Sequence, residues 1–204
     1  MRKNLLPAAL ILSALAVRSS AVSQQIYSLE TKNLRLIYYS KAHEFVVPHL
    51  ARCFENAFGF HSRLFDFHPN EKVNVLLQDF GDYGGGGAAA VPSDYISIGI
   101  APMRYVYETA PANERMNWLM NHEMVHIVAL DKSSRADRTW QKIFMGKVLA
   151  SNEHPLSMFY SYLTNPREYS PRWYHEGIAT FLETWMAGGL GRALGSYDEM
   201  VFRT

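Results

Sequence analysis

The sequence predicts an α+β protein in which strands are concentrated in the first hundred residues and helices follow. Short runs rich in β-branched and aromatic residues occupy the first half. In the second half, apolar residues recur at intervals of three and four, which is the spacing of one helix face. Strands that precede helices are typical of α+β architecture. We therefore expect one domain with an N-terminal mixed β-sheet and a helix, followed by a mainly helical second half.

The first half is expected to form strand, helix, strand, glycine loop and strand in that order. Pro48 lies inside the apolar pattern of the predicted helix and should start or kink it. The glycine run that follows is too flexible for a regular element. The segments are a strand at Leu34–Tyr39, a helix at Ala42–Phe65, a strand at Lys72–Gln78, a loop at Gly81–Gly87, and extended segments at Ala88–Val91 and Tyr95–Ile100.

The second half is expected to contain four helical segments. Glu114 lies in the first turn of the first one, where negative charge suits the helix dipole. Pro155 is well placed at the start of the third, since proline is tolerated in a first turn. The segments are Asn113–Leu130, Arg138–Ala150, Pro155–Leu163 and Arg172–Trp185, the last closed by Gly188 and Gly189.

Residues 1–21 are typical of an export signal. Arg2 and Lys3 precede an uncharged run from Leu5 to Val17, and small residues end at Ala21, as a signal peptidase requires. The run is too short to cross a bilayer as a helix, which takes about 20 apolar residues. We expect a signal peptide over 1–21 and one domain over 22–204, secreted or periplasmic and without stable membrane insertion after cleavage.

Charge and cysteine content exclude several classes of protein. The chain has 20 lysines and arginines against 19 aspartates and glutamates, so its net charge of +1 gives no electrostatic basis for binding nucleic acid or an anionic membrane. Cys53 is the only cysteine and cannot form an internal disulfide. We expect Cys53 to be a buried apolar residue rather than a reactive thiol.

The sharpest chemical signal is the His-Glu-Met-Val-His segment at 122–126. His122 and His126 are four residues apart, so on a helix they project from one face and both imidazoles can reach one zinc at about 2.0 to 2.1 Å. Glu123 projects at an adjacent angle and can take a proton from metal-bound water without binding the metal. The pattern predicts a site for one zinc ion per chain that carries out hydrolysis.

A catalytic zinc needs a third protein ligand and an open position. The metzincin pattern would require glycine and histidine three and six residues after His126, where this chain has alanine and lysine. Cys53 has no suitable motif around it. A glutamate from another helix remains, and Glu176 has small neighbours, Gly177 and Ala179, that would allow two helices to approach closely.

The chain resembles the gluzincin metallopeptidases, which include thermolysin-like and aminopeptidase N-like enzymes. The matching residues are the 122–126 segment and Trp-Tyr-His-Glu-Gly-Ile-Ala-Thr-Phe-Leu-Glu at 173–183. The resemblance implies a zincin-like fold, peptide-bond hydrolysis, the zinc ligands His122, His126 and Glu176, and Glu123 as general base. Glu183, two turns after Glu176, is expected to brace a ligand histidine or the helix pair from outside the ligand set. The gap between His126 and Glu176 is longer than in the best-known gluzincins, so the helices between them are a candidate lid or substrate wall.

The chain is also similar to the peptidase-like domain that precedes Tol-type β-propellers in bacterial envelope proteins. The matching residues are Gly191-Arg192 and a Met-x-x-Arg stretch at 200–203. This resemblance implies a β-propeller downstream, and the short stretch between Glu176 and Thr204 predicts that the chain is a fragment of a longer protein. Gluzincins place a tyrosine or histidine after the glutamate helix to stabilise the oxyanion, and Tyr197 is the sole tyrosine there.

These residues together predict hydrolysis of a peptide or protein substrate. Zinc would polarise the scissile carbonyl, Glu123 would carry a proton from water to the leaving amine, and Tyr197 would steady the oxyanion. The alternative is a non-catalytic envelope interaction module that retains a zincin fold. Such a module would have no need of Glu123.

Three weaker features of the sequence also have ordinary structural explanations. The glycines at 84–87 lead either into a rim strand that pairs with substrate main chain or into a loop tip. His175 is expected to have a surface or packing role rather than to support a ligand or donate to the oxyanion, because a helical neighbour of Glu176 points about 100° away from it. No role is assigned to the remaining histidines, which are His43, His49, His61, His68 and His154.

Overall fold

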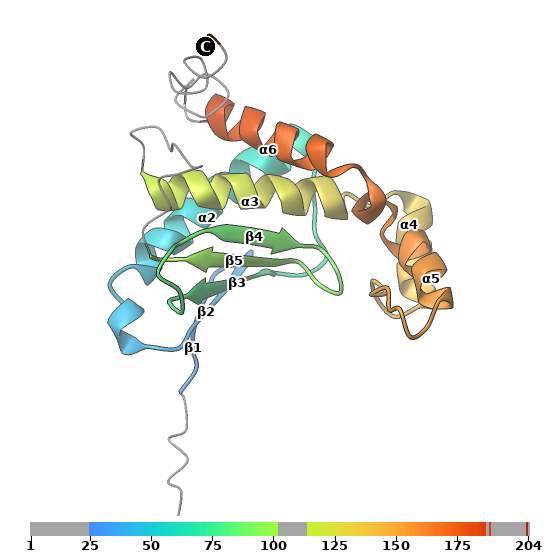
Figure 1. Ribbon diagram of the computed structural model, residues 1–204, viewed down its shortest axis with the longest axis horizontal. Coiled ribbons are helices and arrows are strands. Elements are labelled where there is room, and N and C mark those ends of the chain that lie inside the picture. Colours follow the sequence, from blue (N-terminus) through green and yellow to red (C-terminus); the bar gives the residue numbers. More distant parts are fainter. Residues whose placement is uncertain (1–24, 102–113, 187, 189–202, 204) are drawn as a thin grey trace, which may run out of the picture.

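The computed structural model describes residues 25–101, 114–186, 188 and 203. These residues form an α+β protein with a mixed five-stranded sheet and helices against one of its faces, which confirms the predicted class (Figure 1). The predicted signal peptide over 1–21 and Tyr197 lie outside the described residues. In the part that is described, no helix is long and apolar enough to cross a membrane.

The sheet has the strand order β1-β2-β3-β5-β4. The three central strands are parallel to one another, and both outer strands pair antiparallel with their neighbours. Strand β4 therefore forms one edge. The strands are β1 (Tyr27–Glu30), β2 (Leu34–Tyr38), β3 (Val73–Gln78), β4 (Gly86–Ala89) and β5 (Tyr95–Gly99).

Alternation along the central strands places one face of the sheet in the core. Residues on this face are almost fully buried, whereas the intervening side chains are partly or fully exposed, as expected for a sheet covered on one side. Helix α2 (Val47–Phe65) packs Leu50, Phe54 and Ala57 into this core. The buried strand residues are Leu34, Leu36, Tyr38, Val73, Val75, Leu77, Ile96 and Ile98.

Helix α3 (Arg115–Asp131) lies at the centre of the molecule. It contacts α2, strands β4 and β5, and helix α6 (Arg172–Met186). In Figure 1, α3 runs along β4, α6 lies on the side of α3 away from the sheet, and the pair α4–α5 stands at one end of the molecule. The remaining elements are 3-10 helix η1 (Lys41–His43), α4 (Arg135–Ile143), α5 (Leu156–Thr164) and 3-10 helix η2 (Pro166–Tyr169).

Several predicted boundaries were wrong, and local interactions explain two of them. The helix expected at Arg138–Ala150 runs from Arg135 to Ile143. Ser134 caps its start in a reciprocal pair with Asp137, and after its end the Gly146 amide donates to the Gln141 carbonyl at 2.7 Å while Gly146 has a positive φ.

The first half of the chain also departs from its predicted order. Strand β1 was not predicted. The expected glycine loop extends only to Gly85, because Gly86 and Gly87 pair with Ile98 and Ser97 as part of β4. Pro48 starts α2 instead of kinking it, since the helix begins at Val47.

Candidate metal centre

Helix α3 carries the two histidines in its middle turns. Glu114 caps the helix by accepting hydrogen bonds from the amides of Met116 and Asn117, at 3.0 and 2.6 Å. The sheet-facing residues of α3 are apolar and join the core. His122 is 7% exposed, and His126 lies one turn further along on the same side. The packing of α3 therefore fixes the backbone beneath both imidazoles.

Glu176 comes from α6 and faces the two histidines. Its Oε2 atom lies 3.5 Å from His122 Nε2 and 3.8 Å from His126 Nε2, and the two Nε2 atoms are 3.1 Å apart. The structure thus brings together the three ligand candidates expected from the sequence, although Glu176 lies 50 positions after His126 in the chain.

The spacing of these three atoms suits a zinc ion. Ligand atoms at about 2.1 Å from a tetrahedral zinc lie about 3.4 Å from one another, and the observed separations bracket that value. Two imidazole nitrogens and one carboxylate oxygen are also a donor set that zinc accepts. The Glu176 side chain is 47% exposed, so solvent reaches the ligand candidates from the side of α6.

Glu183 contacts the ring nitrogen of His122 that does not face Glu176. Its carboxylate is fully buried and accepts a hydrogen bond from His122 Nδ1 at 2.7 Å. A proton on Nδ1 leaves the Nε2 lone pair free to bind a metal, and a carboxylate partner of this kind fixes the ring orientation. Glu183 contacts the histidine that it was expected to brace and lies behind the ligand set.

Of the two small residues expected to bring α3 and α6 together, only Ala179 lies in their contact. Gly177 is exposed, and a side chain there would meet nothing within 4 Å, so its small size does not bring the helices together. Ala179 and Leu182 are buried against Val125 of α3. Leu182, one residue before Glu183, therefore fills the helix interface together with Ala179.

Gly86 of β4 lies directly against Glu123. A Cβ atom at Gly86 would come within 2.8 Å of Glu123 Cδ and of Leu119 Cδ1, and still closer to Glu123 Oε1. Glu123 itself is 4% exposed, so its side chain is held between α3 and the edge strand. The glycine in β4 is therefore the residue that leaves room for this carboxylate.

A cleft of about 670 Å³ is lined by the three ligand candidates and by Glu123. Its walls come from the edge strand, α3, the chain around η2 and the start of α6. His175 lies in this wall and is 9% exposed, and neither ring nitrogen has a hydrogen-bond partner in the described part of the chain. The other lining residues are Gly85 to Ala88, Trp118, Leu119, Leu130, Glu168, Ser170 and Arg172.

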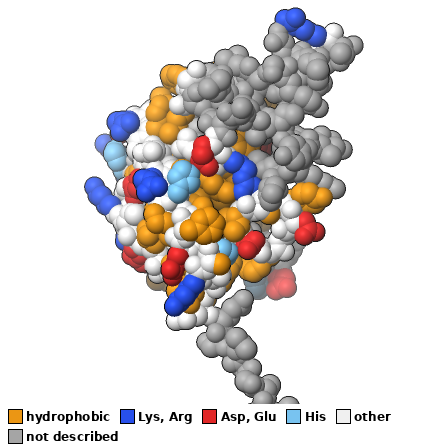
Figure 2. All heavy atoms as spheres, turned by 90° about the vertical axis from the view of Figure 1, so that its left-hand side faces the viewer, with side chains coloured by type: hydrophobic (Ala, Val, Ile, Leu, Met, Phe, Trp, Pro, Cys, Tyr) orange, Lys and Arg blue, Asp and Glu red, His pale blue; other side chains and the backbone are white. Residues whose placement is uncertain are grey.

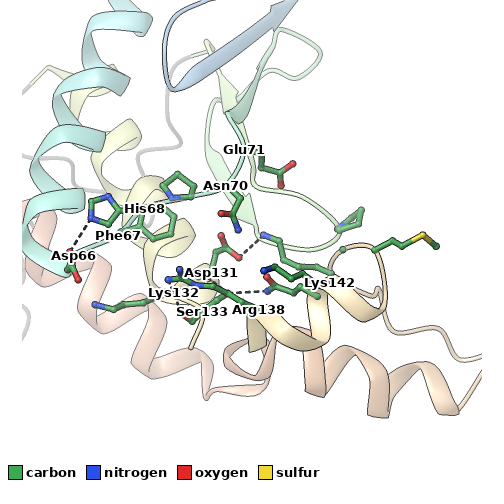
Figure 3. A pocket seen from close by; sticks show the side chains of 16 residues that line it. Asp66, Phe67, His68, Asn70, Glu71, Asp131, Lys132, Ser133, Arg138 and Lys142 are labelled. Atoms are coloured by element: carbon green, nitrogen blue, oxygen red, sulfur yellow. Dashed lines mark hydrogen bonds and ion pairs between the residues drawn. The ribbon is translucent and has the colours of Figure 1, made fainter. Parts of the chain in front are cut away.

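A larger cavity, of about 750 Å³, lies away from the metal-ligand candidates, at the end of α3 (Figure 3). Lys147 bridges Asp94 and Asp131 there, at 2.8 and 2.7 Å, and ties the chain after α4 to the sheet and to α3. Figure 3 shows Asp131 among the basic side chains of Lys132, Arg138 and Lys142. Burial and the neighbouring Asp131 carboxylate raise the pKa of Asp94 to about 7. Sequence patterns gave no sign of this ion cluster.

Cys53 is buried in α2, as expected. Burial, with a smaller effect of the Glu114 carboxylate, raises the pKa of its thiol to about 11. The thiol is therefore not activated as a nucleophile. It lies beside His49 and Glu114.

Comparison with known proteins gives no family assignment: the chain matches no family model, no curated protein and no solved structure.

Proposed function

We propose that the protein is a zinc-dependent peptide hydrolase with a zincin-like fold. The observation that carries this proposal is the convergence of His122, His126 and Glu176 from two helices at separations that suit one zinc ion. Structural zinc sites are closed by four protein ligands, whereas hydrolytic sites leave a position for water. Three ligands at the wall of a cleft support the second kind.

The residues around the ligands have separate roles in the proposed reaction. A zinc ion bound here would polarise the scissile carbonyl and acidify water. Glu123, next in the chain to a ligand but directed at Gly86, takes the water proton and passes it to the leaving amine. Glu183 keeps His122 in the orientation and tautomer that present Nε2 to the metal. Tyr197 remains our proposed oxyanion donor from the sequence.

The edge strand supports a peptide substrate rather than another amide or ester. Among the strands that the structure describes, β4 pairs only with β5, and Gly85 to Ala88 line the cleft. An extended peptide can add to such an edge through main-chain hydrogen bonds, which places its backbone over the metal ligands. The glycines keep side chains away from that path.

Export, location and partners remain proposals from the sequence. We propose that residues 1–21 direct the protein to the periplasm or the exterior, and that a β-propeller follows in the full-length protein. The substrate is then an envelope or extracellular peptide or protein.

Glu123→Gln tests the proposed function. The variant should keep zinc and lose turnover of a mixed peptide library, because the neutral amide of glutamine cannot accept the water proton. Glu153→Gln, which changes an exposed carboxylate elsewhere, is the matched control and should retain turnover. Full turnover by the folded, zinc-loaded Glu123→Gln protein would refute the role of Glu123. Absence of turnover in the zinc-loaded wild type would favour the interaction module instead.

A further inference from the structure

A second group of metal-binding side chains lies between the starts of α2 and α3. His49 and Cys53 are one turn apart in α2, so their side chains project from the same face. Glu114, the N-cap of α3, lies opposite them. Both helix starts are at the end of the molecule that faces the viewer in Figure 2, where acidic, basic and histidine side chains lie among hydrophobic ones.

The donor atoms of the three side chains converge. His49 Nε2 lies 3.2 Å from Glu114 Oε2 and 3.5 Å from Cys53 Sγ, and the sulfur lies 4.0 Å from the same carboxylate oxygen. A tetrahedral zinc with one sulfur, one nitrogen and one oxygen ligand would hold these atoms about 3.4 to 3.6 Å apart. Movements of a few tenths of an ångström would therefore place all three around one ion.

We propose that His49, Cys53 and Glu114 form a second metal site that binds zinc or a similar thiophilic divalent cation. This site is separate from the His122–His126–Glu176 centre and does not depend on hydrolysis there. With both centres loaded, the chain holds two metal ions in place of the one expected from the sequence.

The surroundings of the group allow an ion to enter and be held. The His49 and Glu114 side chains are 40% and 48% exposed, whereas Cys53 is buried, so the ion would sit at the boundary between solvent and core. Thiolate and imidazole together select zinc over magnesium or calcium, which prefer oxygen ligands. Binding displaces the thiol proton, as for any cysteine ligand. Water completes the fourth position.

The proposed ion would join α2 to the first turn of α3. Glu114 already accepts the amide hydrogen bonds that start α3, so an ion on its carboxylate would fix that cap against α2. The ion would therefore hold in place the start of the helix that carries His122 and His126.

Cys53 gives this site a signature that the first centre cannot produce. It is the only cysteine of the chain, so a thiolate-to-cobalt charge-transfer band can arise only here. The metal-free full chain is titrated with Co²⁺ and followed by absorption, with bound cobalt counted after gel filtration. We expect two ions per chain and a thiolate band that saturates with one of them. His126→Asn should keep the band and bind one ion fewer.

Variants at the second site distinguish a metal-binding site from a group of side chains joined only by hydrogen bonds. Cys53→Ser should abolish the band. His49→Gln changes a partly exposed side chain and should weaken the binding of the cobalt ion that gives the band by more than about 100-fold, beyond the loss typical of an outer partner. His68→Gln is the matched control, since His68 also pairs with a carboxylate, Asp66, at the surface. Absence of the band in the folded wild type would overturn the proposal. So would a band that His49→Gln leaves at full affinity.

Discussion

Gly86→Ala tests whether the edge strand sets the position of Glu123. A Cβ at residue 86 would lie 2.8 Å from Glu123 Cδ and closer to Oε1, whereas ordinary contact begins at 3.4 Å. The carboxylate must therefore withdraw by ~1 Å, and a misplacement of this size at a catalytic group costs on the order of 100-fold in rate. Because a flexible side chain can yield without the backbone, we expect the variant to fold and to keep its zinc.

The assay compares kcat for a mixed peptide library at equal zinc occupancy. Gly87→Ala is the matched control in the same strand, since its Cβ would meet only Ser97 Oγ at 3.3 Å. We expect a loss of about 100-fold for Gly86→Ala and a small change for Gly87→Ala. Wild-type kcat in folded, zinc-loaded Gly86→Ala would refute the idea that Gly86 makes room for a catalytic carboxylate.

Two further predictions concern the outer partner and the buried ion cluster. The first pair of variants is made in a Cys53→Ala background, which leaves only the first centre. There Glu176→Ala should lose its zinc to a mild chelator, while Glu183→Ala should bind zinc 10- to 100-fold more weakly than its parent. A metal-free Glu183→Ala protein beside a zinc-replete Glu176→Ala protein would contradict the assignment. Folding raises the pKa of Asp94 from 3.8 to about 7. Between these two values the Asp94 carboxyl is protonated in the folded chain and ionised in the unfolded chain. Its contribution to the free energy of unfolding is therefore complete below about pH 4 and declines as pH rises through 7. Urea unfolding across this range should show that decline in the wild type and not in Asp94→Asn, and equal pH dependence in both would contradict it.

Much of the fold could be predicted because side-chain periodicity reports which face is buried. The strands around Leu36 and Val75 and the helix around His122 lie where the pattern placed them, within a few residues. Strand β4 was predicted only in part, because Gly86 and Gly87 have no side chains to give a pattern. Their extended conformation comes from pairing with the following strand, β5, and not from a side-chain pattern of their own.

The candidate site was likewise predictable only where its signal is local in the sequence. The spacing of His122 and His126 is local and is visible in the sequence, and the motif resemblance pointed to Glu176 and Glu183. The close approach of Gly86 to Glu123 and the burial of His175 depend on tertiary packing that no local pattern encodes. The same holds for the Lys147 cluster, whose members are far apart in the chain.

Diffraction at the zinc absorption edge tests the central claim most directly. Crystals of the zinc-loaded protein should give an anomalous peak about 2.0 to 2.2 Å from His122 Nε2, His126 Nε2 and a Glu176 oxygen, with Glu183 outside ligand distance. A peak at this centre that includes Glu183 in place of Glu176, or the absence of any peak between the two histidines at full zinc loading, would contradict the account.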